Sequence, residues 1–300
     1  MDHNELNRFW DATLKELQAV PIDAEVQAAD PPGMMHEGVK TIQNHSVRMT
    51  SFEGVKIRGW YTTPIGAPPV HGFPAIVTLP GYFGIQPLPV HYVRHGYATL
   101  ALYPRSQGES LQEWKIDHAT RLTYHPKDRN KYYYRAAYMD CVRAVDFLCS
   151  RPEIDKNRVC VWGMSQGGGL ALALGALDSR VKAIAAELAW PLNFPLSCKI
   201  ESKPYGELFE LLKANPGDRD EIMATLAYFD PLHLVKRIKR PVLMDAAFID
   251  TVHPLYTIKD VFDAIECHKA LHVYPDLEHG MRADFARHSL DWFDRYAHLP

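Results

Sequence analysis

The sequence has few of the features that mark disulfide-stabilised or metal-binding proteins. Only five of its 300 residues are cysteines. The count is odd, and three of the five lie inside predicted helices or strands. We therefore expect buried thiols in a reducing compartment rather than disulfides. No C-x-x-C pair occurs, and no cysteine lies near a histidine at zinc-ligand spacing, so the sequence predicts no metal site.

Strong net charge and long apolar runs are also missing. The formal net charge is −3, which gives no overall attraction to nucleic acid or to anionic membranes. No apolar run approaches the length needed to cross a membrane. The first six residues lack the basic and apolar regions of a secretory signal. We expect a cytoplasmic protein with neither a nucleic-acid partner nor a membrane partner.

The remaining pattern alternates short apolar strands with amphipathic helices. Strands are predicted at residues 45–50, 56–62, 74–79, 97–102, 158–162, 181–186, 241–246 and 271–274, and helices near 6–17, 134–148, 170–177, 255–267 and 285–296. This alternation predicts an α/β fold with a mostly parallel, doubly wound sheet and helices on both faces. The hairpin at 45–62 predicts an antiparallel N-terminal edge. The pattern is that of an α/β-hydrolase.

We predict one domain over residues 1–300. It carries an N-terminal helical extension at 1–40 and two insertions, near 109–130 and 190–232. The insertions are irregular and rich in proline or aromatic residues, and neither fits the strand–helix alternation.

Residues 161–169 contain the motif G-x-S-x-G, with Ser165 at its centre. An apolar strand precedes the motif and a helical run follows it. In that context the motif predicts a nucleophile elbow, a tight strained turn that exposes the serine hydroxyl above the sheet. Without the flanking elements, an ordinary glycine-rich turn would be an equally good interpretation.

The predicted partners of Ser165 follow the chain order serine, acid, histidine. Asp245 and Asp250 both lie near the end of a late strand. We choose Asp250 because it lies in the loop beyond the strand, where catalytic groups of open parallel sheets are found. His279 is the only histidine in the loop after the last strand, and we expect it to act as the general base.

An oxyanion hole requires two backbone N–H donors. One is predicted at Gln166, directly after the nucleophile, and the other in the loop after the strand at 74–79, where we favour the Tyr82 amide. The segment after the strand at 181–186 carries two prolines and two large side chains, Trp190 and Phe194. We expect these two residues to bind substrate beside the elbow and to leave room for only a short acyl group.

With these residues placed, the chain resembles carbohydrate esterase family seven, the acetyl xylan esterases and cephalosporin C deacetylases. The similar stretches are Tyr132-Tyr133-Tyr134-Arg135 with Asp140-Cys141-Val142-Arg143-Ala144, Gly163-Met164-Ser165-Gln166-Gly167-Gly168, Tyr228-Phe229-Asp230-Pro231 with Arg237 to Met244, and Arg105-Ser106-Gln107-Gly108. The sequence departs from the family at Ser106, where the family has glycine. It departs again at Gly280, where the family usually has glutamate.

The resemblance implies a serine esterase that removes acetyl groups from small molecules or oligosaccharides. It also implies a homo-oligomer without a metal or organic cofactor. Two alternatives stay open at this point. One is a hydrolase of the same fold that cleaves a carbamate, lactone or amide, and the other is a hydrolase-like binding protein without catalysis. Dienelactone hydrolases are a poorer match because their elbow carries cysteine in place of Ser165.

Overall fold

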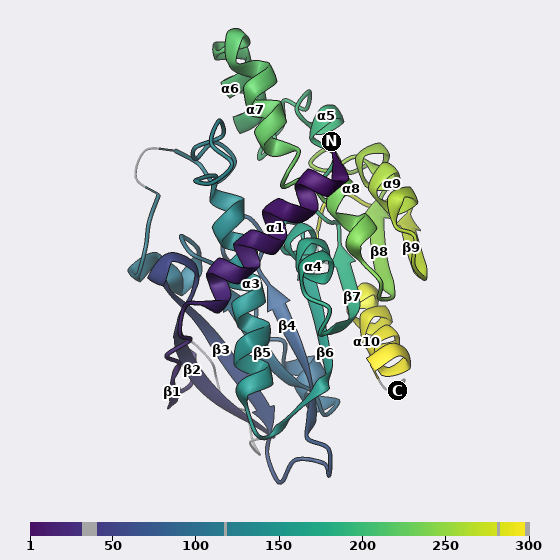
Figure 1. The fold of residues 1–300 in the computed structure, drawn as a ribbon. Coiled ribbons are helices and arrows are strands. Elements are labelled where there is room, and N and C mark those ends of the chain that lie inside the picture. The colour runs from purple at the N-terminus through teal and green to yellow at the C-terminus, as the bar shows by residue number, and fades with distance from the viewer. Residues whose placement is uncertain (32–40, 117–118, 281–282, 298–300) are drawn as a thin grey trace.

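The computed structural model describes residues 1–31, 41–116, 119–280 and 283–297. A sheet in the order β1-β2-β3-β5-β4-β6-β7-β8-β9 runs through the described chain (Figure 1). Its strands are β1 (Glu25–Ala28), β2 (Ile42–Thr50), β3 (Lys56–Pro64), β4 (Phe73–Leu79), β5 (Ala98–Tyr103), β6 (Ile154–Met164), β7 (Val181–Glu187), β8 (Val242–Ala247) and β9 (Lys269–Tyr274). From β5 to β9 all neighbours are parallel, and β1, β2, β3 and β5 pair antiparallel.

Helices cover both faces of this sheet. The longer helices are α1 (His3–Gln18), α3 (Tyr133–Ser150), α4 (Gln166–Leu177), α6 (Gly206–Ala214), α7 (Arg219–Leu226), α9 (Leu255–Ala264) and α10 (Ala283–Ala297). The shorter ones are α2 (Val90–Arg94), α5 (Phe194–Ser197) and α8 (Pro231–Leu234), with 3-10 turns at Phe52–Gly54, Gly108–Gln112, Pro216–Asp218 and Val235–Arg237. Figure 1 shows α1, α3 and α4 over one face.

The central strands are apolar where both of their faces are buried, which in β6 begins at Val159. In β4 and β6, Val77 and Val161 contribute to the core under α3 and α4. Ile76 and Cys160 point the other way, into the smaller core that contains Phe293 of α10. Such continuous apolar strands are typical of a parallel sheet covered on both sides. The predicted fold class is therefore confirmed.

The N-terminal helix is anchored through its apolar stripe. Leu6, Trp10 and Leu17 are buried, and the Trp10 indole donates a hydrogen bond to the Tyr228 carbonyl at 3.0 Å. Arg135 of α3 binds Glu16 with two hydrogen bonds of 2.8 and 2.9 Å. This helix is thus part of the main body of the protein.

Two details differ from the sequence-based expectation. The connector after α1 contains a strand, β1, which pairs with β2 at the edge of the sheet. The helix expected at 255–267 ends earlier, at Ala264. Residues 32–40 of the predicted N-terminal extension lie outside the described residues.

The carboxyl ends of the parallel strands meet at one end of the sheet. The segment with α5, α6 and α7 lies at this end, at the top of Figure 1. Among the described residues, no helix combines the length and the apolar character required to cross a bilayer.

Candidate active site

Ser165 lies at the turn between β6 and α4. Its backbone has φ 55° and ψ −119°, a conformation that costs a non-glycine residue free energy and is found mostly at functional sites. Backbone hydrogen bonds fix it on both sides. The Ser165 amide donates to the Glu187 carbonyl at 2.8 Å, and the Trp190 amide donates to the Ser165 carbonyl at 2.8 Å.

Glycines around Ser165 permit this turn because other backbone segments pass directly beside them. A Cβ on Gly163 would lie 2.2 Å from the Gly167 carbonyl oxygen, and one on Gly167 would lie 2.1 Å from the Leu79 carbonyl oxygen. Added Cβ atoms on Gly168 and Gly169 would lie 2.7 Å from Ala189 Cα and 2.3 Å from the Trp190 carbonyl oxygen. No side chain fits at any of the four positions without a backbone shift.

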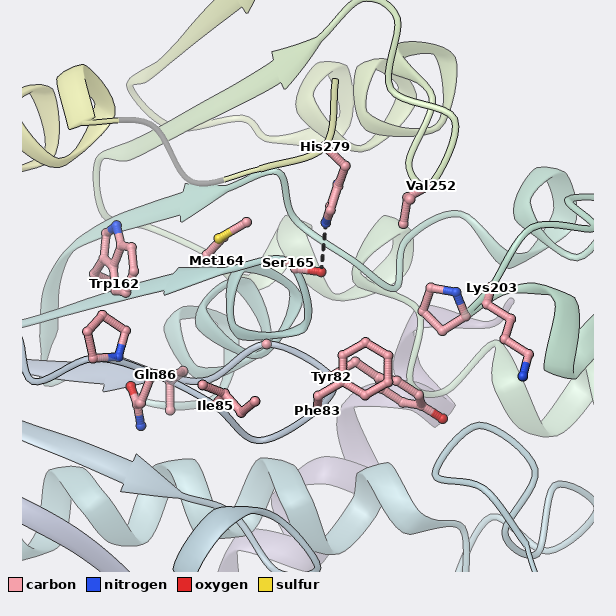
Figure 2. A pocket seen from close by; sticks show the side chains of 14 residues that line it. Tyr82, Phe83, Ile85, Gln86, Trp162, Met164, Ser165, Lys203, Val252 and His279 are labelled. Atoms are coloured by element: carbon pink, nitrogen blue, oxygen red, sulfur yellow. Dashed lines mark hydrogen bonds between the residues drawn. The ribbon is translucent and has the colours of Figure 1, made fainter. Parts of the chain in front are cut away.

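Ser165, His279 and Asp250 form one continuous chain of hydrogen bonds. The distance from Ser165 Oγ to His279 Nε2 is 3.2 Å, drawn as the dashed line in Figure 2. His279 Nδ1 lies 2.7 Å from Asp250 Oδ2. An ionised carboxylate only accepts hydrogen bonds, so Nδ1 carries the proton. Nε2 is then left free to accept the hydroxyl proton of Ser165.

Asp250 is held as a carboxylate although its side chain is buried. Burial alone would raise the pKa of this group. The hydrogen bond and charge of His279, together with the amides of His253 and Val252, more than offset burial and leave the pKa of Asp250 below its ordinary value. Both amides donate to Oδ1 at 2.8 Å. The second oxygen therefore stays oriented toward His279.

The alternative acid, Asp245, and two other histidines make contacts outside the Ser165–His279–Asp250 chain. Asp245 is buried within β8, and its Oδ1 accepts a hydrogen bond from the Leu188 amide at 2.5 Å. His253 is buried, with Nδ1 3.3 Å from the Tyr205 hydroxyl. His272 lies on β9, its ring centre 4.4 Å from that of His288.

The two predicted oxyanion donors come from the start of α4 and from the loop after β4. Gln166 is the first residue of α4. At that position an amide has no acceptor within the helix, and the positive end of the helix dipole favours a negative charge nearby. Tyr82 belongs to the loop after β4 and lines the same cavity as Ser165. The Gln166 side chain is buried and accepts a hydrogen bond from the Tyr134 hydroxyl at 3.1 Å.

The cavity above Ser165 has a volume of about 330 Å³. Its lining is mainly apolar, and Figure 2 shows Met164 and Trp162 on one side of Ser165 and Val252 on another. The lining residues are Leu79, Gly81, Tyr82, Phe83, Ile85, Gln86, Pro87, Trp162, Met164, Ser165, Lys203, Pro204, Val252 and His279.

Neither Trp190 nor Phe194 is among these lining residues, although we expected both to bind substrate. Both side chains are buried, at 0% and 1% exposure. The Trp190 ring packs edge-on against the Tyr82 ring, with centroids 4.9 Å apart. Trp190 thus lies behind a residue of the cavity wall and does not form the wall itself.

Two polar residues that the sequence did not indicate contact Tyr82 in the loop after β4. Arg121 donates to the Tyr82 carbonyl at 2.8 Å, and the Tyr82 hydroxyl donates to Glu207 Oε2 at 2.5 Å. They come from the two irregular segments near 109–130 and 190–232. No motif or periodicity distinguishes them there, so only the folded chain reveals the contact.

Within the described ranges, no three histidine, cysteine, aspartate or glutamate side chains come together in a way that could hold a metal ion.

Comparison with known proteins gives a consistent result. The family model described as "Acetyl xylan esterase (AXE1)" matches residues 1–296. Acetyl esterase Axe7A of Xylanibacter ruminicola is 29% identical over 294 residues, covering 92% of this chain but only 63% of that protein. The chain thus spans less than two thirds of that relative.

Solved structures are similar over nearly the whole chain. The acetyl xylan esterase from Paenibacillus sp. R4 superposes with a TM-score of 0.90 at 29% identity, covering 97% of this chain and 94% of that one. Acetyl xylan esterase 1 from Thermoanaerobacterium sp. JW/SL YS485 gives a TM-score of 0.87 at 24% identity, covering 98% and 94%. The fold, the serine-centred geometry and the full-length family match lead to one conclusion: the chain belongs to the acetyl xylan esterase family.

Proposed function

We propose that the chain is a serine carboxylesterase that hydrolyses acetyl and other short acyl esters of small molecules or oligosaccharides. The observation that carries this proposal is the continuous contact from Asp250 through His279 to Ser165, at the floor of an open, mostly apolar cavity. Membership of the acetyl xylan esterase family supports the acetyl group as the acyl part.

The proposed first half-reaction acylates Ser165. His279 Nε2 takes the hydroxyl proton while Ser165 Oγ adds to the ester carbonyl carbon. The Asp250 carboxylate holds the Nδ1–H tautomer and stabilises the imidazolium that forms. The tetrahedral intermediate then collapses, the bond to the alcohol oxygen breaks, and that oxygen takes the proton from Nε2.

The second half-reaction releases the acid. A water molecule gives a proton to His279 Nε2 and adds to the acyl carbon, and the second tetrahedral intermediate expels Ser165 Oγ, which regains the proton. In both halves we assign the developing oxyanion to the backbone amides of Gln166 and Tyr82. Losing one such donor typically slows catalysis by about 10²–10³-fold.

The test is a pre-steady-state assay with p-nitrophenyl acetate. An acyl-enzyme mechanism predicts release of p-nitrophenol in stoichiometric proportion to active sites, provided that deacylation is slower than acylation. In the opposite case no acyl-enzyme accumulates, and a fluorophosphonate, which labels an activated serine irreversibly, identifies the nucleophile by mass spectrometry. Label or acetyl on a residue other than Ser165, or full turnover after Ser165 is labelled, would contradict the proposed mechanism.

The proposal also includes the oligomeric state and the cellular compartment of the protein. We infer a homo-oligomer because large apolar side chains are exposed at the cavity rim, with Phe83 at 79% and Ile85 at 81% exposure, and such exposed groups often mark protein interfaces. Sedimentation of a monomer at micromolar concentration would contradict this. The five free cysteines are consistent with a cytoplasmic protein, which cell fractionation tests.

A further inference from the structure

A short segment, residues 202–207, contributes two residues to the cavity lining and contacts two other loops beside it. At one end, the Ser202 hydroxyl donates to the Thr251 carbonyl at 2.8 Å, directly beside Asp250. At the other end, Glu207 accepts the hydrogen bond from the Tyr82 hydroxyl. Between them, Lys203 and Pro204 line the cavity. Figure 2 shows Lys203 at the right, with Val252 above it and Tyr82 below it.

The middle of the segment is anchored in the protein interior. The Tyr205 side chain is 0% exposed, and its hydroxyl both accepts from the Leu192 amide at 2.8 Å and donates to the Leu192 carbonyl at 3.0 Å. Its ring packs against Trp190 at 5.3 Å. A segment fixed in this way can transmit position from the acid loop to the oxyanion loop.

Tyr82 is held at three separate points. Its hydroxyl binds Glu207 and its carbonyl accepts from Arg121. Its ring lies between Trp190, at 4.9 Å, and the Arg121 guanidinium, at 5.2 Å. Arg121 in turn donates to the Ser106 carbonyl at 2.5 Å. The two irregular segments of the chain therefore meet at this one residue.

The bond to Glu207 is charge-assisted, as is the bond from the Arg121 guanidinium to the Tyr82 carbonyl. A hydroxyl that donates to a carboxylate makes a charge-assisted hydrogen bond, which is shorter and about twice as strong as a neutral one. Tyr82 is only 6% exposed. Burial, together with the Glu207 carboxylate, raises the pKa of Tyr82 above its ordinary value, so the hydroxyl keeps its proton and remains the donor.

We propose that Glu207 is a positioning residue for the oxyanion hole, which acts through the Tyr82 hydroxyl to keep the Tyr82 amide aimed at the developing oxyanion, while Ser202 ties the same segment to the acid loop. This inference rests on the proposed esterase function. It assigns a catalytic purpose to the 190–232 segment, which supplies none of the residues in the Ser165–His279–Asp250 chain.

The proposal predicts a graded loss of transition-state stabilisation. Removing a whole oxyanion donor costs about 10²–10³-fold. A Tyr82 amide that is less well positioned but still present should lower the rate by a smaller factor. We expect Glu207→Ala to lower kcat for p-nitrophenyl acetate about 10- to 100-fold while KM changes less than about threefold, because the lost contact acts mainly in the transition state.

The experiment compares three variants with a matched control. Tyr82→Phe removes the hydroxyl and keeps the ring, and Glu207→Gln keeps an acceptor without the charge. The control is Glu210→Ala, on the same helix α6, where the exposed carboxylate has an ion pair with Lys213 at 3.9 Å. Circular dichroism and thermal unfolding establish that each variant is folded.

The decisive measurement is inhibition by a trifluoromethyl ketone, which forms a tetrahedral adduct with the serine. If Glu207 acts on the oxyanion hole, Ki should rise by the same factor as kcat/KM falls, and Glu207→Gln should recover part of both. Tyr82→Phe should match Glu207→Ala, and the double variant should be no worse than either. Glu210→Ala should equal wild type.

A folded Glu207→Ala and a folded Tyr82→Phe that both work within twofold of wild type would overturn the proposal. So would an unchanged Ki despite a fall in kcat/KM. If Glu207→Ala does not fold, Tyr82→Phe and Glu207→Gln decide alone. Ser165→Ala distinguishes failure of this inference from failure of the proposed function. If Ser165→Ala is inactive and Glu207→Ala has normal activity, only the positioning role of Glu207 is wrong. If Ser165→Ala is active, the proposed esterase function is wrong.

Discussion

The two sides of the cavity are built in different ways. The side of Ser165, His279 and Asp250 is fixed by its own residues. Backbone closes around the elbow glycines, and two side-chain contacts join the three residues to one another. The side of Tyr82 is fixed from outside, by Arg121 and Glu207 from two distant segments. The difference implies that changes on the first side should nearly abolish the reaction, whereas changes on the second should tune it.

The largest effect is expected from Ser165→Ala and His279→Ala. Ser165→Ala removes the nucleophile and His279→Ala removes its general base, and neither group acts without the other. In a well-studied serine protease either loss lowers kcat roughly a million-fold. We expect kcat for p-nitrophenyl acetate to fall by several orders of magnitude in both variants, with unchanged circular dichroism. Near-normal turnover by pure Ser165→Ala would remove the hydroxyl from the mechanism.

The next largest effect is expected from Asp250→Asn. An amide in place of the carboxylate favours the wrong imidazole tautomer, a change that costs about 10⁴-fold in a related triad. Asp245→Asn is the matched control because Asn can still accept from the Leu188 amide. Compared at equal folded fraction, the order of kcat/KM should be wild type, then Asp245→Asn, then far below them Asp250→Asn. The reverse order would show that Asp245 is the acid.

A smaller effect on kcat/KM is expected when the pH is lowered. Because the pKa of Asp250 lies below its ordinary value, that carboxylate is already ionised over the range in which histidine side chains titrate. Lowering the pH through this range should therefore reduce kcat/KM through one ionisation, by protonating the base. Two resolved ionisations on the acid limb would contradict this assignment, and the profile should be the same with and without EDTA.

The smallest effect is expected on acyl-length preference. Wild type should prefer p-nitrophenyl acetate to butyrate and octanoate. Met164 lines the cavity beside Ser165, so Met164→Ala should raise the butyrate-to-acetate ratio of kcat/KM several-fold, within the roughly 1–3 kcal/mol that one methylene can be worth. Trp190 lies behind Tyr82, so Trp190→Phe should slow all esters alike. A shifted ratio in Trp190→Phe alone would restore Trp190 as a determinant of substrate size.

The fold could be predicted from the sequence because the apolar residues follow clear strand and helix patterns. The strands β4 and β7 and the second half of β6 are apolar runs bounded by turns, and α1 and α10 have regular buried stripes. The strand β1 was missed because its four residues, Glu25–Ala28, are mostly exposed and gain their conformation from pairing with β2. Edge strands of this length leave little pattern in a sequence.

The candidate site was predictable only where motif and chain order coincide. Ser165, Asp250 and His279 each lie just beyond a strand, and the fold brings strand ends together. The contact between Tyr82 and Glu207 joins positions 125 residues apart, and no local pattern encodes such a contact. Trp190 packs against Tyr82 of the cavity lining without lining the cavity itself, because whether a bulky side chain faces a cavity or packs behind it is settled by tertiary packing.

Ser106 shows how a departure from the family pattern can be accommodated. Its backbone has φ 59°, a conformation that favours the glycine found in the family. In this chain the serine hydroxyl accepts a hydrogen bond from the Ile116 amide at 3.2 Å. The side chain thus gains a contact with the irregular segment that carries Arg121.

The four crowded glycines at 163 and 167–169 also limit how this sequence can diversify. Every one of them abuts main-chain atoms that no rotamer change can move, so a randomised library at these codons should return the parental sequence or unfolded protein. Variation is open instead at the cavity lining, where Phe83, Ile85 and Val252 are at least partly exposed. Under laboratory or natural selection, new substrate preferences should therefore accumulate on the rim while the nucleophile turn stays unchanged.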